Sequence, residues 1–409
     1  MQFYENAKKA SKDLAKLNVK QIDEILQACA NDLKQNLDDI IKANEIDLKN
    51  ARETGLKESL IDRLKLDKSR VLAMVEGIQK IVNLPSPLNE YIETKELDNG
   101  LKIAKKRVAM GVIAVIYEAR PNVTSDAFAM CLKAGSVVIL KGGKEAINTN
   151  EAIVKVFQNT LKRLGFNQNY INYLNDTSRD ATLNLMKMNK YIDLLIPRGG
   201  AGLIQSVVQN STIPVIETGV GNCHIYVDKS ADLTKAINII KNAKTQRVSV
   251  CNALETLLIH EDIMPTLMPL IIDELKGTQL RVCEVIANKF SGLKVACELD
   301  FADEFLDYIL AIKCVKDLDE ALEHIDKYSS KHSDAIITQD YTNARIFTNT
   351  VDSAVVYVNA STRFSDGEQF GLGAEIGIST QKLHARGPMG LKEITSYKYI
   401  VLGDGQFRE

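Results

Sequence analysis

Apolar side chains recur at helical spacing over the first 83 residues of the chain. Ile22, Ile25 and Leu26 share one face of a predicted helix, and the opposite face is charged. Pro85-Ser86-Pro87 ends this region, since proline stops a helical pattern. The pattern predicts a purely helical segment that covers a larger domain and has no catalytic role.

Between residues 91 and 110 the apolar period changes from helical to alternating. Two alternating runs, 91–97 and 101–108, flank Asp98-Asn99-Gly100, which is a strong signal for a hairpin turn. Exposed strand edges are a liability that pairing with another chain removes. We therefore expect this hairpin, together with a final strand at 397–402, to join the subunits of a homo-oligomer.

From residue 111 onward, short runs rich in Val, Ile and Leu alternate with helical stretches. Such runs are typical of parallel strands that are buried on both faces, with helices between them. In the first half we expect strands at about 111–117, 136–141, 170–174, 191–197 and 213–217, and helices at about 125–134, 144–164, 178–188 and 202–210. In the second half we expect strands at about 254–260, 280–286, 308–315, 334–338 and 353–358. The alternation predicts an α/β protein with doubly wound parallel sheets.

These patterns divide the chain into five segments. They are the N-terminal helices (1–90), the hairpin (91–110), a first α/β domain (111–230), a second α/β domain (231–360), and a glycine-rich return segment with the C-terminal strand (361–409). A long glycine-rich stretch inside a globular chain is more often a functional loop than a linker.

Composition narrows the function classes. The chain has 409 residues, 45% hydrophobic and 25% charged, which is typical of a soluble globular protein with room for two domains. A net charge of −2 without polybasic tracts argues against nucleic-acid and membrane-surface binding. The seven cysteines include no C-x-x-C pair, so we expect neither a disulfide framework nor a zinc site, and no metal. Because no apolar leader or spanning segment is present, we expect a cytoplasmic protein.

Residues 244–262 contain the strongest candidate for a nucleophile. Cys251 lies in a connection between a predicted helix and a predicted strand, where a side chain can meet a ligand. Lys244 and Arg247 precede it, and nearby cations favour the thiolate. The alternative is a small buried apolar side chain, which is what most cysteines are. Taken alone, this stretch favours that alternative.

Other candidates lie beyond the carboxyl ends of the predicted strands, where parallel α/β sheets bind ligands. After the first strand, Asn122 is able to donate to an oxyanion and Arg120 to face a phosphate. Turn chemistry set by Pro121, with Asn122 as a helix cap, is the alternative and is favoured locally. After the fifth strand, Glu217 is either a general acid or base, or a helix cap or turn ligand.

Two further loops have the composition of nucleotide-binding turns. Lys141-Gly142-Gly143-Lys144-Glu145 places two lysines around a glycine pair, which suits a ribose or its 2′-phosphate, although a solvated strand end has the same spacing. Arg198-Gly199-Gly200-Ala201-Gly202 precedes a predicted helix, whose N-terminus would favour an anion. The G-x-G-x-x-G spacing is absent, so the second loop is a moderate signal for a nucleotide.

Taken together, these blocks resemble the aldehyde dehydrogenase superfamily, and most closely its branch that reduces L-glutamyl 5-phosphate. The resemblance covers nearly the whole chain. The blocks that carry it are Glu118–Ser125, Leu140–Glu145, Pro197–Leu203, Ile216–His224, Gln246–Thr256, Ala321–Ile325, Ser333–Ile336, Gly371–Thr380 and His384–Leu391. The implied fold has two doubly wound α/β domains, a Rossmann-like cofactor domain and a catalytic domain, with a small β oligomerisation element.

The resemblance also implies roles for single residues. Cys251 matches the nucleophile, Asn122 the oxyanion-hole asparagine, and Glu217 the glutamate that activates water in hydrolytic relatives. Here Glu217 is followed by Thr-Gly-Val-Gly, and proton transfer with the thiol or hemithioacetal is the role that remains. The residues that match the cofactor-binding positions are Lys141, Gly142, Lys144, Glu145, Arg198, Gly199, Gly200, Gly202 and Glu304. Arg120, Arg247 and Arg386 are candidate phosphate ligands.

The implied reaction is NADPH-dependent reduction of L-glutamyl 5-phosphate to L-glutamate 5-semialdehyde through a cysteine thioester, the second step of proline biosynthesis from glutamate. The implied partners are the small-molecule substrate, further copies of the chain, and, transiently, a glutamate 5-kinase. The alternatives are a water-using aldehyde dehydrogenase and a non-catalytic scaffold on the same fold.

Overall fold

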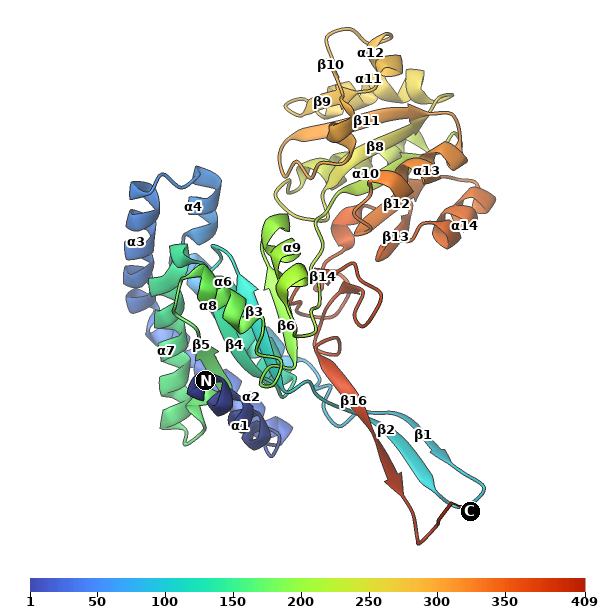
Figure 1. The fold of residues 1–409 in the computed structure, drawn as a ribbon. Coiled ribbons are helices and arrows are strands. Elements are labelled where there is room, and N and C mark those ends of the chain that lie inside the picture. Colours follow the sequence, from blue (N-terminus) through green and yellow to red (C-terminus); the bar gives the residue numbers. More distant parts are fainter. Residues whose placement is uncertain (409) are drawn as a thin grey trace. The chain divides into compact units, whose positions relative to one another are not determined.

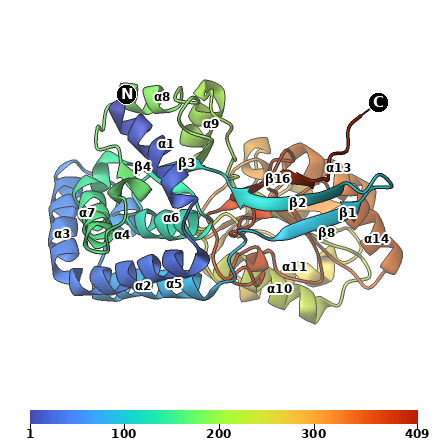
Figure 2. The same ribbon diagram turned by 90° about the horizontal axis from the view of Figure 1, so that it is seen from below.

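The computed structural model describes residues 1–408, and its first 83 residues are helical, as the periodicity predicts. The helices are α1 (Gln2–Leu14), α2 (Val19–Gln35), α3 (Leu37–Glu53), α4 (Glu58–Leu64) and α5 (Lys68–Asn83). Asn18 and Gln21 form a reciprocal capping box that satisfies the first amides of α2. The apolar face of α2 is buried, and α2 and α5 lie side by side (Figure 2).

A four-stranded parallel sheet follows, in the order β5-β4-β3-β6 (Figure 1). Its strands are β3 (Val112–Tyr117), β4 (Val137–Gly142), β5 (Ile171–Tyr173) and β6 (Leu194–Arg198). The helices between and after them are α6 (Asn122–Lys133), η1 (Lys144–Ala146), α7 (Ile147–Arg163), η2 (Gln168–Tyr170), α8 (Arg179–Leu185) and α9 (Ala201–Asn210). Helices α1, α8 and α9 lie on one face of the sheet and α6 and α7 on the other (Figure 2).

The predicted fifth strand, 213–217, is wrong as an element. It forms one isolated bridge, in which Val215 lies beside Leu195 of β6. The carbonyl oxygen of Pro214 accepts from the Leu195 N–H, but proline has no N–H to extend the ladder. Glu217 therefore follows a single bridge and is not the end of a strand.

A seven-stranded, wholly parallel sheet forms the second half, in the order β10-β9-β11-β8-β7-β12-β13. Its strands are β7 (Cys223–Val227), β8 (Leu254–His260), β9 (Gln279–Val282), β10 (Lys294–Val295), β11 (Ile309–Val315), β12 (Ser333–Ile337) and β13 (Val355–Val358). Its helices are α10 (Leu233–Thr245), α11 (Met264–Glu274), α12 (Glu284–Ala287), η3 (Glu298–Phe301), α13 (Leu318–Tyr328), α14 (Tyr341–Thr350) and η4 (Thr362–Phe364).

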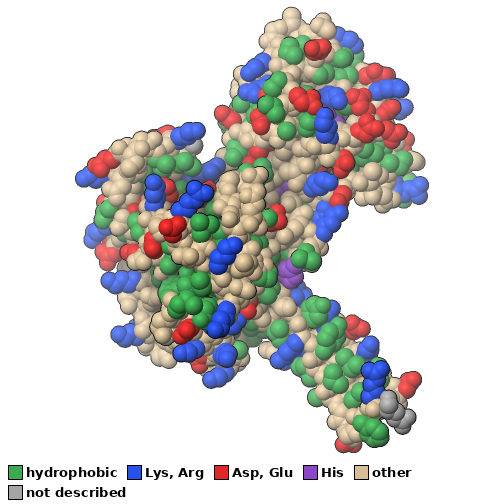
Figure 3. All heavy atoms as spheres, in the orientation of Figure 1, with side chains coloured by type: hydrophobic (Ala, Val, Ile, Leu, Met, Phe, Trp, Pro, Cys, Tyr) green, Lys and Arg blue, Asp and Glu red, His purple; other side chains and the backbone are tan. Residues whose placement is uncertain are grey.

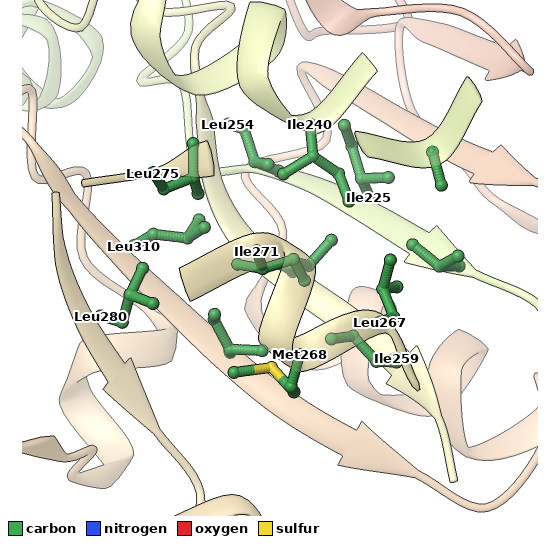
Figure 4. Packing of buried hydrophobic residues seen from close by; sticks show 14 of the residues in the cluster. Ile225, Ile240, Leu254, Ile259, Leu267, Met268, Ile271, Leu275, Leu280 and Leu310 are labelled. Carbon is green, nitrogen blue, oxygen red and sulfur yellow. The ribbon is translucent and has the colours of Figure 1, made fainter. Parts of the chain in front are cut away.

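Alternating side chains of the central strands supply two cores. Ile225 of β7 and Ile259 of β8 pack against α10 and α11, as Figure 4 shows for Ile240 and Leu267. The adjacent residue of each strand points to the other face, where Tyr226 and Leu258 meet α13 and α14. Strands buried on both faces require the near-continuous apolar runs that the sequence shows.

The chain divides into two compact units, and each is described by itself. Unit 1 comprises Met1–Glu217, Gly371–Gly377 and the chain from Met389 onward; unit 2 comprises Thr218–Phe370 and Ile378–Pro388. The division after Glu217 precedes the expected boundary at 230/231, because β7 pairs with β8 and β12 of unit 2. The return segment expected at 361–409 contributes to both units, and its β14 (Ile378–Ser379) and β15 (Gly387–Pro388) form a short antiparallel pair.

A three-stranded antiparallel sheet, here called the arm, completes unit 1. It consists of β1 (Tyr91–Glu96), β2 (Lys102–Ala109) and β16 (Thr395–Leu402), with β2 in the middle (Figure 1). The predicted turn closes it, and Gly100 adopts a φ of +84°, which favours glycine. All of β1 is exposed. Among the described helices, none has the length and apolar character needed to cross a membrane.

Candidate active site

Cys251 lies in unit 2, in the connection that leads from α10 into β8. Its side chain is half-buried, whereas Cys29, Cys131 and Cys223 are buried. Helix α10 ends at Thr245 and β8 begins at Leu254, so the thiol stands on irregular backbone ahead of a fully buried strand. A half-buried thiol on such a connection is open to a ligand in a way that a core cysteine is not.

Gly221 lies directly against the backbone of Cys251. A Cβ atom at position 221 would overlap the carbonyl oxygen of Cys251, so only glycine fits there. The same carbonyl oxygen accepts a hydrogen bond from the Cys223 thiol at 3.2 Å. Two residues of the 221–223 segment therefore fix the main chain that carries the candidate nucleophile.

Glu304 belongs to the same cluster in unit 2. Its Oε1 accepts from the N–H of Gly221 at 2.7 Å. Gly221 in turn contacts Cys251, so a single residue links this carboxylate to the candidate nucleophile. The sequence places Glu304 among the cofactor-binding residues. The structure adds that it anchors the glycine that packs on Cys251.

A buried ion pair holds the Glu304 loop in place. Lys244 Nζ and Glu255 Oε2 are 2.6 Å apart, and both side chains are fully buried. Glu255 Oε1 also accepts from the N–H of Leu306 at 3.1 Å. Burial raises the pKa of Glu255 to about 7 and lowers the pKa of Lys244, because it disfavours both charged forms. From the sequence we expected Lys244 to stabilise a thiolate at Cys251. In the structure its ammonium group instead forms an ion pair with Glu255.

The three candidate phosphate arginines have different surroundings. Arg386 donates from Nη2 to the carbonyl oxygen and to Oδ1 of Asp352, at 2.8 and 2.9 Å, so its charge is already paired. Arg247 is exposed and stands four residues before Cys251. Arg120 is exposed in unit 1, between β3 and α6.

In unit 1, Glu118 contacts one of the predicted cofactor loops, the turn from Arg198 to Gly202. Its Oε2 accepts from the N–H of Gly200 at 2.9 Å, and a Cβ on Gly199 would lie 2.6 Å from the same oxygen. Helix α9 begins at Ala201 without a side-chain cap, so the Glu118 carboxylate occupies an anion-binding position at its N-terminus. The sequence reasoning missed Glu118, although it lies in the same block as Asn122.

Lys141 lies at the end of β4 with only 5% of its surface exposed. In the described part of the chain its ammonium is bonded to the carbonyl oxygen of Gly142, at 3.1 Å. Desolvation lowers the pKa of Lys141, and Asp176 and Glu145 oppose that shift. Gly142 packs so closely on Asn150 that a Cβ would overlap its amide. Close packing therefore requires glycine at position 142, whether or not a ligand approaches the backbone there.

These features fit the phosphates and ribose of a dinucleotide. Lys141 and the exposed Lys144 lie at the carboxyl end of β4, and the turn from Arg198 to Gly202 lies at the carboxyl end of β6. These two parallel strands flank β3, and their carboxyl ends form the edge where such sheets bind ligands. A desolvated ammonium bonded to one carbonyl oxygen retains donors for a phosphate. At the α9 N-terminus, the Gly200 N–H donates to the Glu118 carboxylate, so a phosphate that used this N–H would have to replace that carboxylate.

Asn122 is the first residue of α6 and is exposed. The alternative role as a helix cap is wrong, because Pro121 occupies the cap position and no side chain caps the helix. Asn122 Nδ2 donates to Asp126 Oδ2 at 3.0 Å, one turn along the helix. Desolvation raises the pKa of Asp126 to about 6, and the charge of Arg198 opposes that shift. Asp126 is a residue that the sequence reasoning missed.

Glu217 is half-buried on the segment that leads from the Val215 bridge to β7. No helix starts after it, since the next element is a strand, so the helix-cap alternative for Glu217 does not apply. Within residues 1–408, no group of three or more His, Cys, Asp or Glu side chains is arranged to hold a metal ion.

Comparison with known proteins agrees with this fold. A family model described as "Aldehyde dehydrogenase family" matches residues 2–284. Gamma-glutamyl phosphate reductase of Clostridium kluyveri is 53% identical over 406 residues, covering 99% of this chain and 97% of that protein. The enzyme of the same name from Carboxydothermus hydrogenoformans is 54% identical over 404 residues, covering 98% and 97%.

A solved structure is similarly close. The crystal structure of gamma-glutamyl phosphate reductase from Thermotoga maritima matches with a TM-score of 0.98 and 45% identity, and the match covers 100% of this chain and 99% of that one. The chain therefore belongs to the aldehyde dehydrogenase family and, within it, to the gamma-glutamyl phosphate reductases, and it is an oxidoreductase.

Proposed function

We propose that this enzyme reduces L-glutamyl 5-phosphate to L-glutamate 5-semialdehyde and phosphate with NADPH, in the synthesis of proline from glutamate. The similarity over the full chain supports the substrate class. The observation that supports the mechanism most directly is the half-buried thiol of Cys251. Gly221 and Cys223 fix the backbone of the connection on which this thiol lies. Such a thiol suits covalent catalysis on an activated acyl group.

Cys251 acts as the nucleophile. Its thiolate attacks the acyl carbon, a carbon–sulfur bond forms, and the carbon–oxygen bond to phosphate breaks with its electron pair leaving on the phosphate. NADPH, when bound, supplies the hydride that the acyl carbon needs to reach the aldehyde level. The hemithioacetal on Cys251 then loses its proton, the carbon–sulfur bond breaks, and the thiolate is regenerated as the aldehyde leaves.

Asn122 and Glu217 assist with the oxygen and the proton. One N–H of the Asn122 amide is used by Asp126, and the amide has a second N–H for the oxyanion that forms in each acyl-transfer step. Glu217 exchanges a proton with the thiol or the hemithioacetal, because a reductase has no use for water activation at a thioester.

The cofactor-binding residues lie in both units. Lys141, Gly142, Lys144, Glu145, Arg198, Gly199, Gly200 and Gly202 of unit 1 would hold the adenosine and phosphate portion, and Glu304 of unit 2 the nicotinamide ribose. The two lysines favour NADPH over NADH, since the 2′-phosphate is the group that distinguishes them. The enzyme works in the cytoplasm as a homo-oligomer that a glutamate 5-kinase contacts transiently.

The test is the reverse reaction, with L-glutamate 5-semialdehyde, NADP and phosphate as reactants. The wild type is expected to form NADPH only when phosphate is present. Cys251→Ala is expected to lose activity by at least about 10³-fold, because the nucleophile is absent. Cys297→Ser, at an exposed thiol, is the matched control and keeps wild-type rates.

Two results would contradict this function. NADPH formation without phosphate would indicate a water-using aldehyde dehydrogenase. An active Cys251→Ala variant would exclude a mechanism through a thioester on Cys251. A measurement without turnover supports the same assignment: iodoacetamide at neutral pH is expected to modify Cys251 faster than the other six cysteines.

A further inference from the structure

The short helix η4 is fixed to the residue that follows Cys251. Thr362 Oγ1 donates to the carbonyl oxygen of Asn252 at 2.7 Å. The Asn252 side chain in turn donates to the carbonyl oxygens of Ser365, at 2.9 Å, and Arg363, at 3.4 Å. Thr362, Ser365 and Asn252 are all buried, so these bonds are protected from water. The position of η4 is therefore tied to the loop of the nucleophile.

Arg363, in the middle of η4, reaches the other side of the same loop. Its side chain is half-buried, and its Nε donates to Gln246 Oε1 at 2.8 Å. Gln246 precedes Arg247 in the chain, and the Arg247 guanidinium is near enough to Arg363 to lower its pKa. Desolvation is the largest cause that lowers the pKa of Arg363, and the charge of Arg247 is the second largest. The Cys251 thiol is also close enough to affect the pKa of Arg363.

Neither guanidinium forms an ion pair with a carboxylate in residues 1–408. Asp366 is the carboxylate near enough to raise the pKa of Arg363, and it does so without a bond. Elsewhere in unit 2 the half-buried arginines are paired, Arg281 with Asp300 and Arg386 with Asp352. Two close, unneutralised cations repel each other, and a bound anion would offset that repulsion.

We infer that Arg363 and Arg247 form a phosphoryl-binding site beside Cys251, which holds the phosphate of the acyl phosphate and releases it after the thiol attacks. This inference rests on the proposed function. The hydrogen bond to Gln246 uses Nε of Arg363 and leaves both Nη groups, which match two oxygens of a phosphate. Arg247 was predicted for this role from the sequence, whereas Arg363 and Gln246 were not.

The phosphoryl group fits this position better than the α-carboxylate of the glutamyl chain. The leaving phosphate is bonded through one oxygen to the carbon that the thiol attacks, so its site must adjoin the nucleophile. The α-carboxylate lies at the opposite end of the five-carbon chain. A dianion also balances two guanidinium charges, whereas a carboxylate balances one.

The experiment is the reverse reaction with phosphate and semialdehyde varied separately. Arg363→Gln is expected to raise the KM for phosphate by roughly 10- to 100-fold, the effect of losing a charged hydrogen-bonding group, with the KM for semialdehyde unchanged. Arg363→Lys is expected to be intermediate, because it keeps the charge without the planar pair of donors. Arg345→Gln, on the exposed face of α14, removes an equal charge and is the control.

A second measurement does not depend on turnover. Inorganic phosphate is expected to slow the alkylation of Cys251 by iodoacetamide in the wild type and in Arg345→Gln, but not in Arg363→Gln. Arg247→Gln, at an exposed position, supplies the same test if Arg363 variants fold poorly, as judged by thermal melting.

The inference fails if both the phosphate KM and the phosphate protection are unchanged in Arg363→Gln and Arg247→Gln. It also fails if the KM for semialdehyde rises instead, because the arginines would then bind the α-carboxylate. Both results are distinct from a failure of the proposed function, in which the wild type itself would show no dependence on phosphate.

Discussion

Because Gly221 has no side chain, the main chain at this position can lie directly against Cys251. The backbone N–H of Gly221 is bonded to Glu304 and its Cα faces the Cys251 carbonyl group, so the residue is enclosed on both sides. A methyl group at this position cannot be accommodated by a side-chain rotation, since the atoms that it meets belong to the backbone. The position therefore couples the stability of unit 2 to the placement of the thiol.

We expect Gly221→Ala to destabilise the protein by about 2 kcal/mol or more, because backbone must move to make room. Displacement of the Cys251 loop should also slow the alkylation of Cys251 by iodoacetamide. The measurements are urea denaturation and the rate of labelling. Gly77→Ala, in the interior of α5, is the matched control: its Cβ has room, and it should stabilise the protein by about 0.5–1 kcal/mol. Wild-type stability in Gly221→Ala would show that the loop tolerates the methyl group.

The candidate residues themselves were predictable from the sequence, but their contacts were not. Cys251 and Asn122 stand out because they lie in blocks that carry the family resemblance, whereas Glu304 was placed only by that resemblance. The bond from Gly221 to Glu304 spans 83 residues, and the bond from Gly200 to Glu118 spans 82. No local pattern encodes such distances, so Gly221 and Glu118 emerge only once the strands are in register.

At the scale of elements, buried strands with regular apolar runs were the most predictable. The predicted strand 254–260 is β8, with the same bounds. The predicted strand 280–286 ends early, because Cys283 begins a helical turn and α12 follows. Strand β7 was missed: His224 interrupts its apolar run, and only its pairing with β8 and β12 explains why a histidine is buried there.

Three histidines are buried around β7, α13 and β12, and in the described structure their Nε2 atoms have no hydrogen-bond partner. They are His224, His324 and His332. Desolvation lowers the pKa of all three, to about 4 for His332 and to about 2 for His324. Between pH 6.5 and these values the unfolded chain binds protons that the folded chain does not, so stability falls as the pH is lowered.

We expect His332→Gln to weaken this acid sensitivity. The contribution of His332 is fully present above its unfolded pKa of about 6.5, and it is lost as the pH falls toward 4. From pH 7.5 to pH 5 the wild type should therefore lose about 2 kcal/mol more of its unfolding free energy than the variant. Urea denaturation at the two pH values measures this difference. His384→Gln, at an exposed position, should match the wild type; an equal loss in His332→Gln would rule out this titration.

At the scale of the whole molecule, the candidate residues are distributed over both units. Unit 1 holds the predicted cofactor loops and Asn122, and unit 2 holds Cys251, Glu304 and the arginine pair. The chain passes from unit 1 to unit 2 after Glu217 and returns through segments of 371–390, so the glycine-rich stretch is the second connection between the units. Within this stretch Gly371 and Gly373 adopt φ of +74° and +75°, a conformation that favours glycine.

The arm exposes more apolar surface than its three strands need for their own pairing. Tyr397, Tyr399 and Val401 alternate along β16 and so share one face, with exposed fractions of 51%, 60% and 55%. Hydrophobic side chains are visible along the arm, interspersed with Lys or Arg side chains (Figure 3). The outer edges of β1 and β16 also leave backbone groups unpaired within the sheet. An exposed apolar face with open strand edges is typical of a surface that a second copy covers.

We therefore expect the wild type to sediment as a homo-oligomer, and Tyr399→Glu/Val401→Glu to sediment as a smaller species, because two buried charges would be unpaired at the interface. Lys398→Glu lies on the same strand but points to the opposite face, so it changes the charge of the arm without touching the apolar face. It should keep the wild-type mass. Sedimentation velocity over a range of protein concentrations separates these outcomes, and circular dichroism checks the fold of each variant. If the double variant kept the wild-type mass, the apolar face of the arm would not be part of the subunit interface.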